Sequence, residues 1–197
     1  MSLARASLAA LAVFALAACD GSPAPEAPAP GPEAPTTIDP TPGAQASGAL
    51  SLEGEGLRAF TEQGSARALP FGTAQDMTLT AVSTLLGADT PAVTTNSECG
   101  AGPMQFAEYP NGLQLAFQDD KFVGWFLDES GLTTADGVGV GVGSTRTELG
   151  SARVVEMIPD STLGEEFSSG ELGGFLTSEA PDATVESLYA GMTCFFR

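Results

Sequence analysis

Apolar side chains between residues 73 and 87 recur at the spacing of a helix. Thr73, followed three positions later by Asp76, resembles a capping box, which is a common signature of a helix start. Gly87 is suited to end the helix, because glycine adopts the left-handed C-cap conformation without steric cost. The pattern predicts a helix over 74–86 with an apolar stripe made of Met77, Ala81, Val82, Leu85 and Leu86.

From residue 104 onward the spacing of apolar positions changes to that of strands. Segment 104–109 is strand-like, and segment 112–127 alternates apolar and polar residues around a turn at Asp119 and Asp120, which predicts a hairpin. Strict alternation in its second strand would place Val123, Trp125 and Leu127 on one face and Phe122 and Phe126 on the other. Since both faces are apolar, we expect the helix at 74–86 to cover one and residues 50–60 to cover the other.

A weaker copy of this arrangement follows later in the chain. Residues 137–144 alternate Gly and Val, which predicts a strand, and Thr145 with Glu148 again resembles a capping box. The helix behind it is short, because Gly150 interrupts it. Strand-like segments then follow at 152–158, 165–176 and 183–197. A helix followed by antiparallel strands, found twice, predicts an α+β fold.

The motifs that the two parts share resemble a known family. The stretches "LPFGTAQDMTLTAVSTLLG" (69–87) and "VGVGSTRTELGSARVV" (140–155) each place a glycine and a hydroxyl residue before a helix. This order is similar to the tandem half-repeats of beta-lactamase inhibitor proteins and of related small lipoproteins of the bacterial envelope. The resemblance covers residues 69–197 and implies two similar α+β halves, 49–130 and 131–197. It carries over no inhibitor contact residue.

The first eighteen residues have the layout of an export signal. Arg5 precedes an unbroken apolar run over residues 8–18, which is too short to span a bilayer. The run ends in Leu16, Ala17 and Ala18, and Cys19 follows directly, which together resemble the bacterial lipoprotein box. That resemblance implies a signal peptide over 1–18 and a lipid, with fatty acids such as palmitate, on the Cys19 thiol. The alternative is an ordinary secretory signal in which Cys19 is accidental.

The segment over residues 19–48 is rich in Pro and Ala and holds almost no large apolar side chain. It cannot bury enough surface to fold, so its composition predicts a disordered tether between the lipid and a globular head. A Pro-rich ligand for a partner domain is the alternative. The lipid would anchor the protein in a membrane of the cell envelope, with the head facing the periplasm or the exterior. Asp20 resembles a retention signal of some lipoproteins and favours the inner membrane.

The charge of the chain limits its partners and its chemistry. Seven Lys and Arg stand against twenty-five Asp and Glu, which gives a net charge of −18. Such a surface repels phosphate backbones, so we expect no nucleic acid as a partner. The chain has no histidine, which removes the commonest general base and most catalytic zinc sites. We therefore expect no catalytic residue, cofactor or metal, although calcium binding by the acidic surface stays open.

Two cysteines remain once Cys19 carries a lipid. An even pair in an exported chain is most simply a disulfide, so we predict that Cys99 bonds to Cys194. The alternative is two buried free thiols.

Two classes of function remain. The first is a non-catalytic binding or assembly module tethered in the envelope, with an envelope protein as its partner. The alternative is a carboxylate-based hydrolase acting on cell-wall or glycan material, which would need a concave site with converging carboxylates. For the binding module we select Trp125, Phe126 and Tyr189 as candidate contact residues, because aromatic side chains dominate interface energetics. For Trp125 the competing interpretation is a place in the core.

Overall fold

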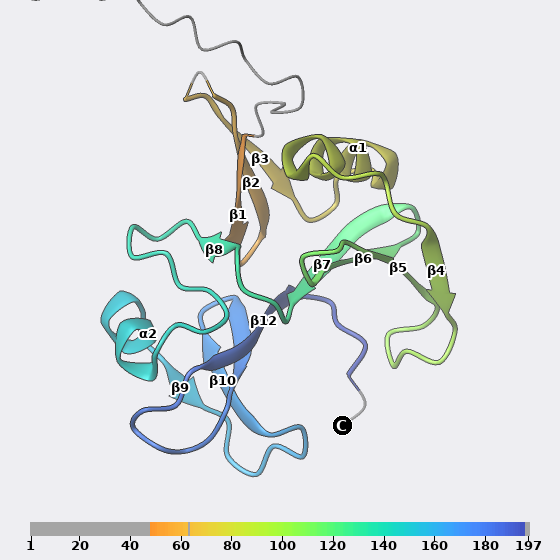
Figure 1. The fold of residues 1–197 in the computed structure, drawn as a ribbon. Helices are drawn as coiled ribbons and strands as arrows, with labels where there is room; N and C mark the ends of the chain where they lie inside the picture. The colour runs from red at the N-terminus through yellow and green to blue at the C-terminus, as the bar shows by residue number, and fades with distance from the viewer. Residues whose placement is uncertain (1–47, 63, 196–197) are drawn as a thin grey trace, which may run out of the picture. The chain divides into compact units, whose positions relative to one another are not determined.

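The computed structural model of the chain describes residues 48–62 and 64–195. These residues form twelve strands in two sheets and two short helices, which confirms the predicted α+β class (Figure 1). The predicted signal peptide 1–18, the lipidation site Cys19 and the tether up to residue 47 lie outside the described residues. Neither helix in the described part of the chain is long and apolar enough to cross a membrane.

A four-stranded sheet opens the described part of the chain. Its strands are β1 (Ala49–Glu53), β2 (Gly56–Phe60), β3 (Ala66–Pro70) and β8 (Thr133–Thr134). The first three form an antiparallel meander, and β8 pairs parallel to β1. Leucines of the meander, Leu50, Leu52, Leu57 and Leu69, are buried on one face of this sheet. The sequence pattern predicts no strand before residue 69, so most of this sheet is an addition to the expected fold.

Helix α1 (Gln75–Leu86) lies where the sequence predicts a helix, but its first turn differs. The N-cap is Ala74, and the Thr73 hydroxyl donates to the Pro70 carbonyl at 2.7 Å instead of capping. The predicted capping box is therefore wrong for this helix. The physical reason is that the main chain of Thr73 already pairs with a strand of the second sheet.

Most of the predicted apolar stripe of α1 is confirmed, because Val82 is buried and Ala81, Leu85 and Leu86 pack against the main core. Leu79 and Val82 are buried, whereas 48% of Met77 is exposed, so Met77 does not belong to the apolar stripe. The C-terminus is as predicted, because Gly87 adopts φ 59° and its amide donates to the last carbonyls of the helix.

The second sheet has eight strands, and every neighbouring pair is antiparallel. In spatial order the strands are β4 (Val93–Asn96), β5 (Met104–Glu108), β6 (Leu113–Gln118), β7 (Lys121–Leu127), β12 (Val185–Gly191), β11 (Leu172–Leu176), β10 (Glu165–Ser169) and β9 (Glu156–Met157). The predicted hairpin is β6 and β7, and Asp119 and Asp120 both have positive φ in its two-residue turn. Strand β9 is much shorter than the predicted 152–158, where Val154 is 82% exposed.

A β-bulge in β7 changes which side chains share a face. Phe122 and Gly124 pair with consecutive residues of β6, so Val123 is an extra residue between them. Phe122 and Trp125 consequently lie on the same face, in the main core, and Phe126 lies on the opposite face. The predicted strict alternation, which placed Phe122 with Phe126, is wrong for this reason.

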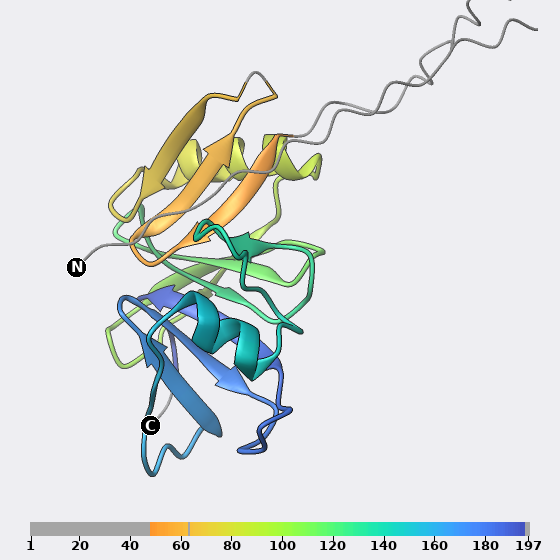
Figure 2. The ribbon, with the colours of Figure 1, turned by 90° about the vertical axis from the view of Figure 1, so that its left-hand side faces the viewer.

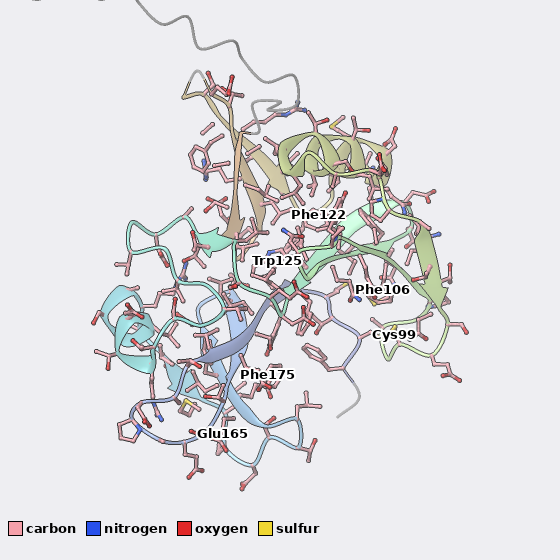
Figure 3. The ribbon with its side chains drawn as sticks, viewed as in Figure 1. Cys99, Phe106, Phe122, Trp125, Glu165 and Phe175 are labelled. Atoms are coloured by element: carbon pink, nitrogen blue, oxygen red, sulfur yellow. A yellow bond between two sulfur atoms is a disulfide. The ribbon has the colours of Figure 1, made fainter. Side chains whose placement is uncertain are left out.

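The main core lies where α1 and the four-stranded sheet meet one face of the eight-stranded sheet. Buried leucines of β1, β2 and α1 belong to the same apolar cluster as Phe122, Trp125 and Leu127. Figure 3 shows Phe122 and Trp125 on the side of the strands that faces α1. The expectation that the helix and residues 50–60 cover opposite faces of the hairpin is therefore wrong, because both cover the same face.

Helix α2 (Arg146–Ala152) begins with the capping box that the sequence predicts. The Thr145 hydroxyl accepts a hydrogen bond from the Glu148 amide at 3.2 Å, and the Glu148 carboxylate accepts one from the Thr145 amide at 2.7 Å. The bonds from the Thr145 amide and hydroxyl lower the pKa of Glu148 from its ordinary value. Figure 2 shows α2 in front of the strands β10 to β12, and its buried Leu149 joins the main core.

The Gly-Val stretch before α2 does not form the predicted strand. Gly137, Gly139 and Gly143 have φ values of 65°, 71° and 89°, which an extended strand does not allow. Val138 is 56% exposed, whereas Val140 is buried in the core. Left-handed glycines therefore override the alternation of apolar residues in this loop.

Candidate functional site

The face of the eight-stranded sheet opposite the main core carries a row of polar and aromatic side chains that runs across the strands. Pairing of β5, β6, β7 and β12 aligns Glu108, Gln114, Phe126 and Tyr189 in this row. Each of these residues is exposed or half-buried. In the following paragraphs this surface is called the second face.

The C-terminal tail, residues 192–195, folds back onto the second face after β12. The Met192 amide donates to the Val123 carbonyl at 2.8 Å. Gly124 permits this approach, because a Cβ atom there would lie 2.1 Å from the Met192 carbonyl oxygen. Further along, the disulfide between Cys99 and Cys194 holds the tail, with Cα atoms 5.1 Å apart, and confirms the predicted pairing.

Beyond the disulfide, the last described residue of the tail packs on three aromatic rings of the sheet. The ring centroid of Phe195 lies 5.1 Å from that of Tyr189, 5.7 Å from that of Phe175 and 5.9 Å from that of Phe126. All three contacts are edge-to-face, the arrangement that aromatic quadrupoles favour. The disulfide and this aromatic cluster together make the tail a wall that stands on the second face.

A cavity of about 380 Å³, here called the tail groove, lies between this wall and strands β4 to β7. Figure 3 shows Phe106 and Cys99 on this side of the strands, away from α1. Its lining residues are Thr94, Asn96, Phe106, Glu108, Gln114, Ala116, Trp125, Phe126, Met192, Thr193, Cys194 and Phe195. Its composition, apolar rings with a few amide and hydroxyl groups, is typical of ligand pockets.

A second cavity of about 290 Å³ adjoins the tail groove and shares Glu108, Gln114 and Phe126 with it. It is here called the acidic pocket, because Asp128 and Glu129 line its far side. The Gln114 amide donates to the Glu108 carboxylate at 2.9 Å, which orients both side chains along the rim that the two cavities share.

Tyr189 is tied to a buried carboxylate. Its hydroxyl donates to Glu166 at 2.6 Å, and the Ser161 hydroxyl donates to the other oxygen of Glu166 at 2.6 Å. The ring of Tyr189 crosses β11 directly above Gly173, where a Cβ atom would lie 2.2 Å from the ring. Glu166 is completely buried, so these two hydrogen bonds give it the partners that a buried polar group requires.

The three contact residues that the sequence suggests have different places in the structure. Trp125 is among the residues that border the tail groove, but it is only 1% exposed and its indole Nε1 donates to the Glu53 carbonyl at 2.9 Å, so it is a core residue and not an exposed anchor. Phe126 is half-buried and lines both the tail groove and the acidic pocket. Tyr189 is half-buried beside Phe195 and lines neither cavity.

Sequence reasoning misses the contribution of the tail to this site. Phe195 and Met192 line the groove although neither lies in a strand. The predicted bond from Cys99 to Cys194 is the signal that could have found them, because it brings the tail beside the strand that follows Cys99.

A separate cavity of about 400 Å³ lies near α2 and β10. Asp160, Glu165 and Glu179 line it together with Arg146, whose guanidinium donates to the Glu179 carbonyl at 2.7 Å. Figure 3 shows Glu165 well apart from Phe106 and Cys99. Among the described residues, no group of three or more acidic or cysteine side chains is placed to hold a metal ion.

The described residues thus form an antiparallel α+β domain with a cavity between one face of its larger sheet and a disulfide-held tail. In comparisons with known proteins, no family model, no curated protein and no solved structure matches the chain.

Proposed function

We propose that the chain is a lipid-anchored protein of the cell envelope whose head binds a partner protein, without catalysis, through the tail groove. The observation that carries the proposal is the groove itself, a cavity built from an aromatic sheet face and a disulfide-held tail. The lining offers apolar rings and amides, the groups that make contact area and orient a bound chain at interfaces. A lipid on Cys19 and a Pro-rich tether would present this groove to the envelope.

The anchor is tested at Cys19. Replacing Cys19 by serine removes the thiol that would carry the lipid, so we expect loss of fatty-acid labelling and release of the protein into the soluble export fraction. Radiolabelled palmitate incorporation and membrane fractionation of the two strains measure both effects. Label retained by the Cys19→Ser variant would show that the lipoprotein box is misread.

We also infer that the head consists of two similar halves, 49–130 and 131–197, and several backbone hydrogen bonds support this. In the first half, the Gly72 amide donates to the Phe122 carbonyl at 2.7 Å, and the Phe122 amide donates to the Thr73 carbonyl at 2.8 Å. The Gln75 amide, at the start of α1, donates to the Asp120 carbonyl at 3.0 Å. These bonds fasten the turn before α1 to the start of β7.

The second half has the same set of bonds. The Gly143 amide donates to the Val185 carbonyl and the Val185 amide donates to the Ser144 carbonyl, both at 2.8 Å. The Arg146 amide, at the start of α2, donates to the Ala183 carbonyl at 2.9 Å. The last strand of each half, β7 or β12, lies at the centre of the eight-stranded sheet, where the two pair. In this proposal the tail groove lies on the first half, while the second half supplies the wall.

The binding function is tested with a photo-crosslinking residue placed in the groove. With p-benzoylphenylalanine at Gln114 we expect a discrete crosslinked product in native envelopes, and none with the same residue at exposed Asp89, which lines neither cavity. Phe126→Ala should lower the yield at Gln114 about tenfold or more, because aromatic anchors dominate interfaces. Immunoblotting of the crosslinked envelopes measures these yields.

Equal products from Gln114 and Asp89, or none from either, would contradict a binding function of the groove. The alternative function, a carboxylate-based hydrolase, has one supporting observation, the cavity lined by Asp160, Glu165 and Glu179. Release of sugar fragments from purified cell-wall sacculi by the wild type, abolished by Glu165→Gln, would favour that alternative instead.

A further inference from the structure

The tail groove and the acidic pocket form one continuous surface. They share Glu108, Gln114 and Phe126, and together they extend from the tail across β5, β6 and β7 to the acidic residues that follow β7. A single ligand that fills both cavities must therefore contact apolar side chains at one end and carboxylates at the other.

The apolar end is built to receive a hydrophobic side chain. Phe106 and Ala116 form part of its floor, and Met192 of the tail, which is 38% exposed, borders it. Methionine adapts its shape to different apolar partners, which suits a recognition site. Asn96 and Gln114 add amides with both donors and acceptors, the groups that a peptide main chain requires.

Carboxylates dominate the acidic end. Among residues 48–62 and 64–195, neither cavity has Lys or Arg in its lining, whereas Glu108, Asp128 and Glu129 all line the acidic pocket. Asp128 and Glu129 are exposed, and no described residue forms an ion pair or a side-chain hydrogen bond with their carboxylates. A positive group on the ligand would therefore complement this end.

We infer that the occupant of this surface is an extended basic segment of the partner protein. An aromatic or aliphatic side chain of that segment fills the end between Phe106 and Met192, and a Lys or Arg nearby reaches Asp128 and Glu129. The inference rests on the proposed binding function and adds the chemistry of the partner. The net charge of −18 attracts such a segment over a longer range and speeds its association.

A library of random ten-residue peptides, selected for binding to the full chain carrying Cys19→Ser, tests this inference. We expect the enriched peptides to combine an aromatic or large aliphatic residue with an excess of Lys and Arg. Fluorescence anisotropy of one enriched peptide, labelled with fluorescein, then gives its dissociation constant for each variant at low and high ionic strength.

The double variant Asp128→Asn with Glu129→Gln should weaken the peptide about tenfold at low ionic strength, and less at high ionic strength because salt screens exposed charges. Phe126→Ala should weaken it about thirtyfold, the loss expected for an aromatic anchor. The matched control is Asp89→Asn with Glu186→Gln, which removes the same charge from exposed sites that line neither cavity. We expect the control to change affinity less than about twofold.

Enriched peptides that are neutral or acidic would overturn the inference. So would a control variant that weakens binding as much as the Asp128 and Glu129 variant, since binding would then follow net charge alone. A site-specific crosslink at Gln114 in envelopes, together with no basic peptide in the selection, would overturn the basic segment and leave the binding function standing. Basic peptides that bind the groove, with no crosslink in envelopes, would overturn the proposed binding function and leave standing only the preference of the groove for basic peptides.

Discussion

Replacing both Cys99 and Cys194 by serine is expected to lower the free energy of unfolding by about 4–5 kcal/mol. The disulfide joins residues 95 positions apart, so its loss returns much conformational entropy to the unfolded chain. A second effect is local. Without the bond, the tail keeps the Met192 amide bond to Val123 and the ring contacts of Phe195 as its described attachments to the sheet. We therefore expect the tail to detach from the sheet part of the time, which would open the tail groove on that side.

Denaturant unfolding of the full chain carrying Cys19→Ser, with and without the two further serines, measures the first effect. Reduction and alkylation of the unsubstituted pair is the matched control, because it breaks the same bond without changing the residues. The local effect is read from the crosslinking yield at Gln114, which should fall in the serine variant under conditions where it remains folded. An unfolding free energy that changes by less than about 1 kcal/mol would contradict the expected role of the long loop.

The parts of the fold that follow from short-range patterns are predicted from the sequence. The hairpin at 112–127 follows from the alternation of apolar residues around Asp119 and Asp120, and the C-cap of α1 follows from Gly87. The disulfide follows from the even pair of cysteines that remains under the hypothesis of an exported chain with a lipid on Cys19. Each of these features depends on neighbouring residues or on general chemistry, so a single sequence is enough to find it.

The parts that fail depend on partners far away in the chain. The bulge at Val123 lies in β7, which pairs with β6 on one edge and with β12 on the other, and it reverses the expected face of Phe122. Thr73 does not cap α1, because its main chain pairs with the start of β7. The Gly-Val alternation of residues 137–144 predicts a strand, but Gly137, Gly139 and Gly143 take left-handed conformations that the alternation does not reveal.

The candidate site was only partly predictable for the same reason. Phe126 has the expected aromatic character, and the structure places it on the rim of the groove. Trp125, its neighbour in sequence, faces the other side of the sheet and is buried in the core. The wall of the groove comes from residues 192–195, about seventy positions after Phe126. In the sequence, only the predicted disulfide indicates that these residues lie beside the strands.

Trp125→Ala is expected to lower the free energy of unfolding by about 3–5 kcal/mol, the usual cost of truncating a large buried aromatic side chain. The indole is 1% exposed and packs in the main core. Its Nε1 also donates to the Glu53 carbonyl of β1 at 2.9 Å, so it joins the two sheets. Truncation would leave a cavity and remove this link. Denaturant unfolding of the full chain carrying Cys19→Ser measures the loss.

Two further substitutions separate the packing of Trp125 from its hydrogen bond and from the groove. Trp125→Phe keeps an aromatic ring in the core but loses the N–H donor, so we expect a smaller cost of about 1–2 kcal/mol. Phe126→Ala changes the half-buried neighbour on the second face, so it should cost less stability than Trp125→Ala but more crosslinking yield at Gln114. If Trp125→Ala instead unfolded like the unsubstituted protein and reduced that yield, Trp125 would act in binding and its place in the core would be wrong.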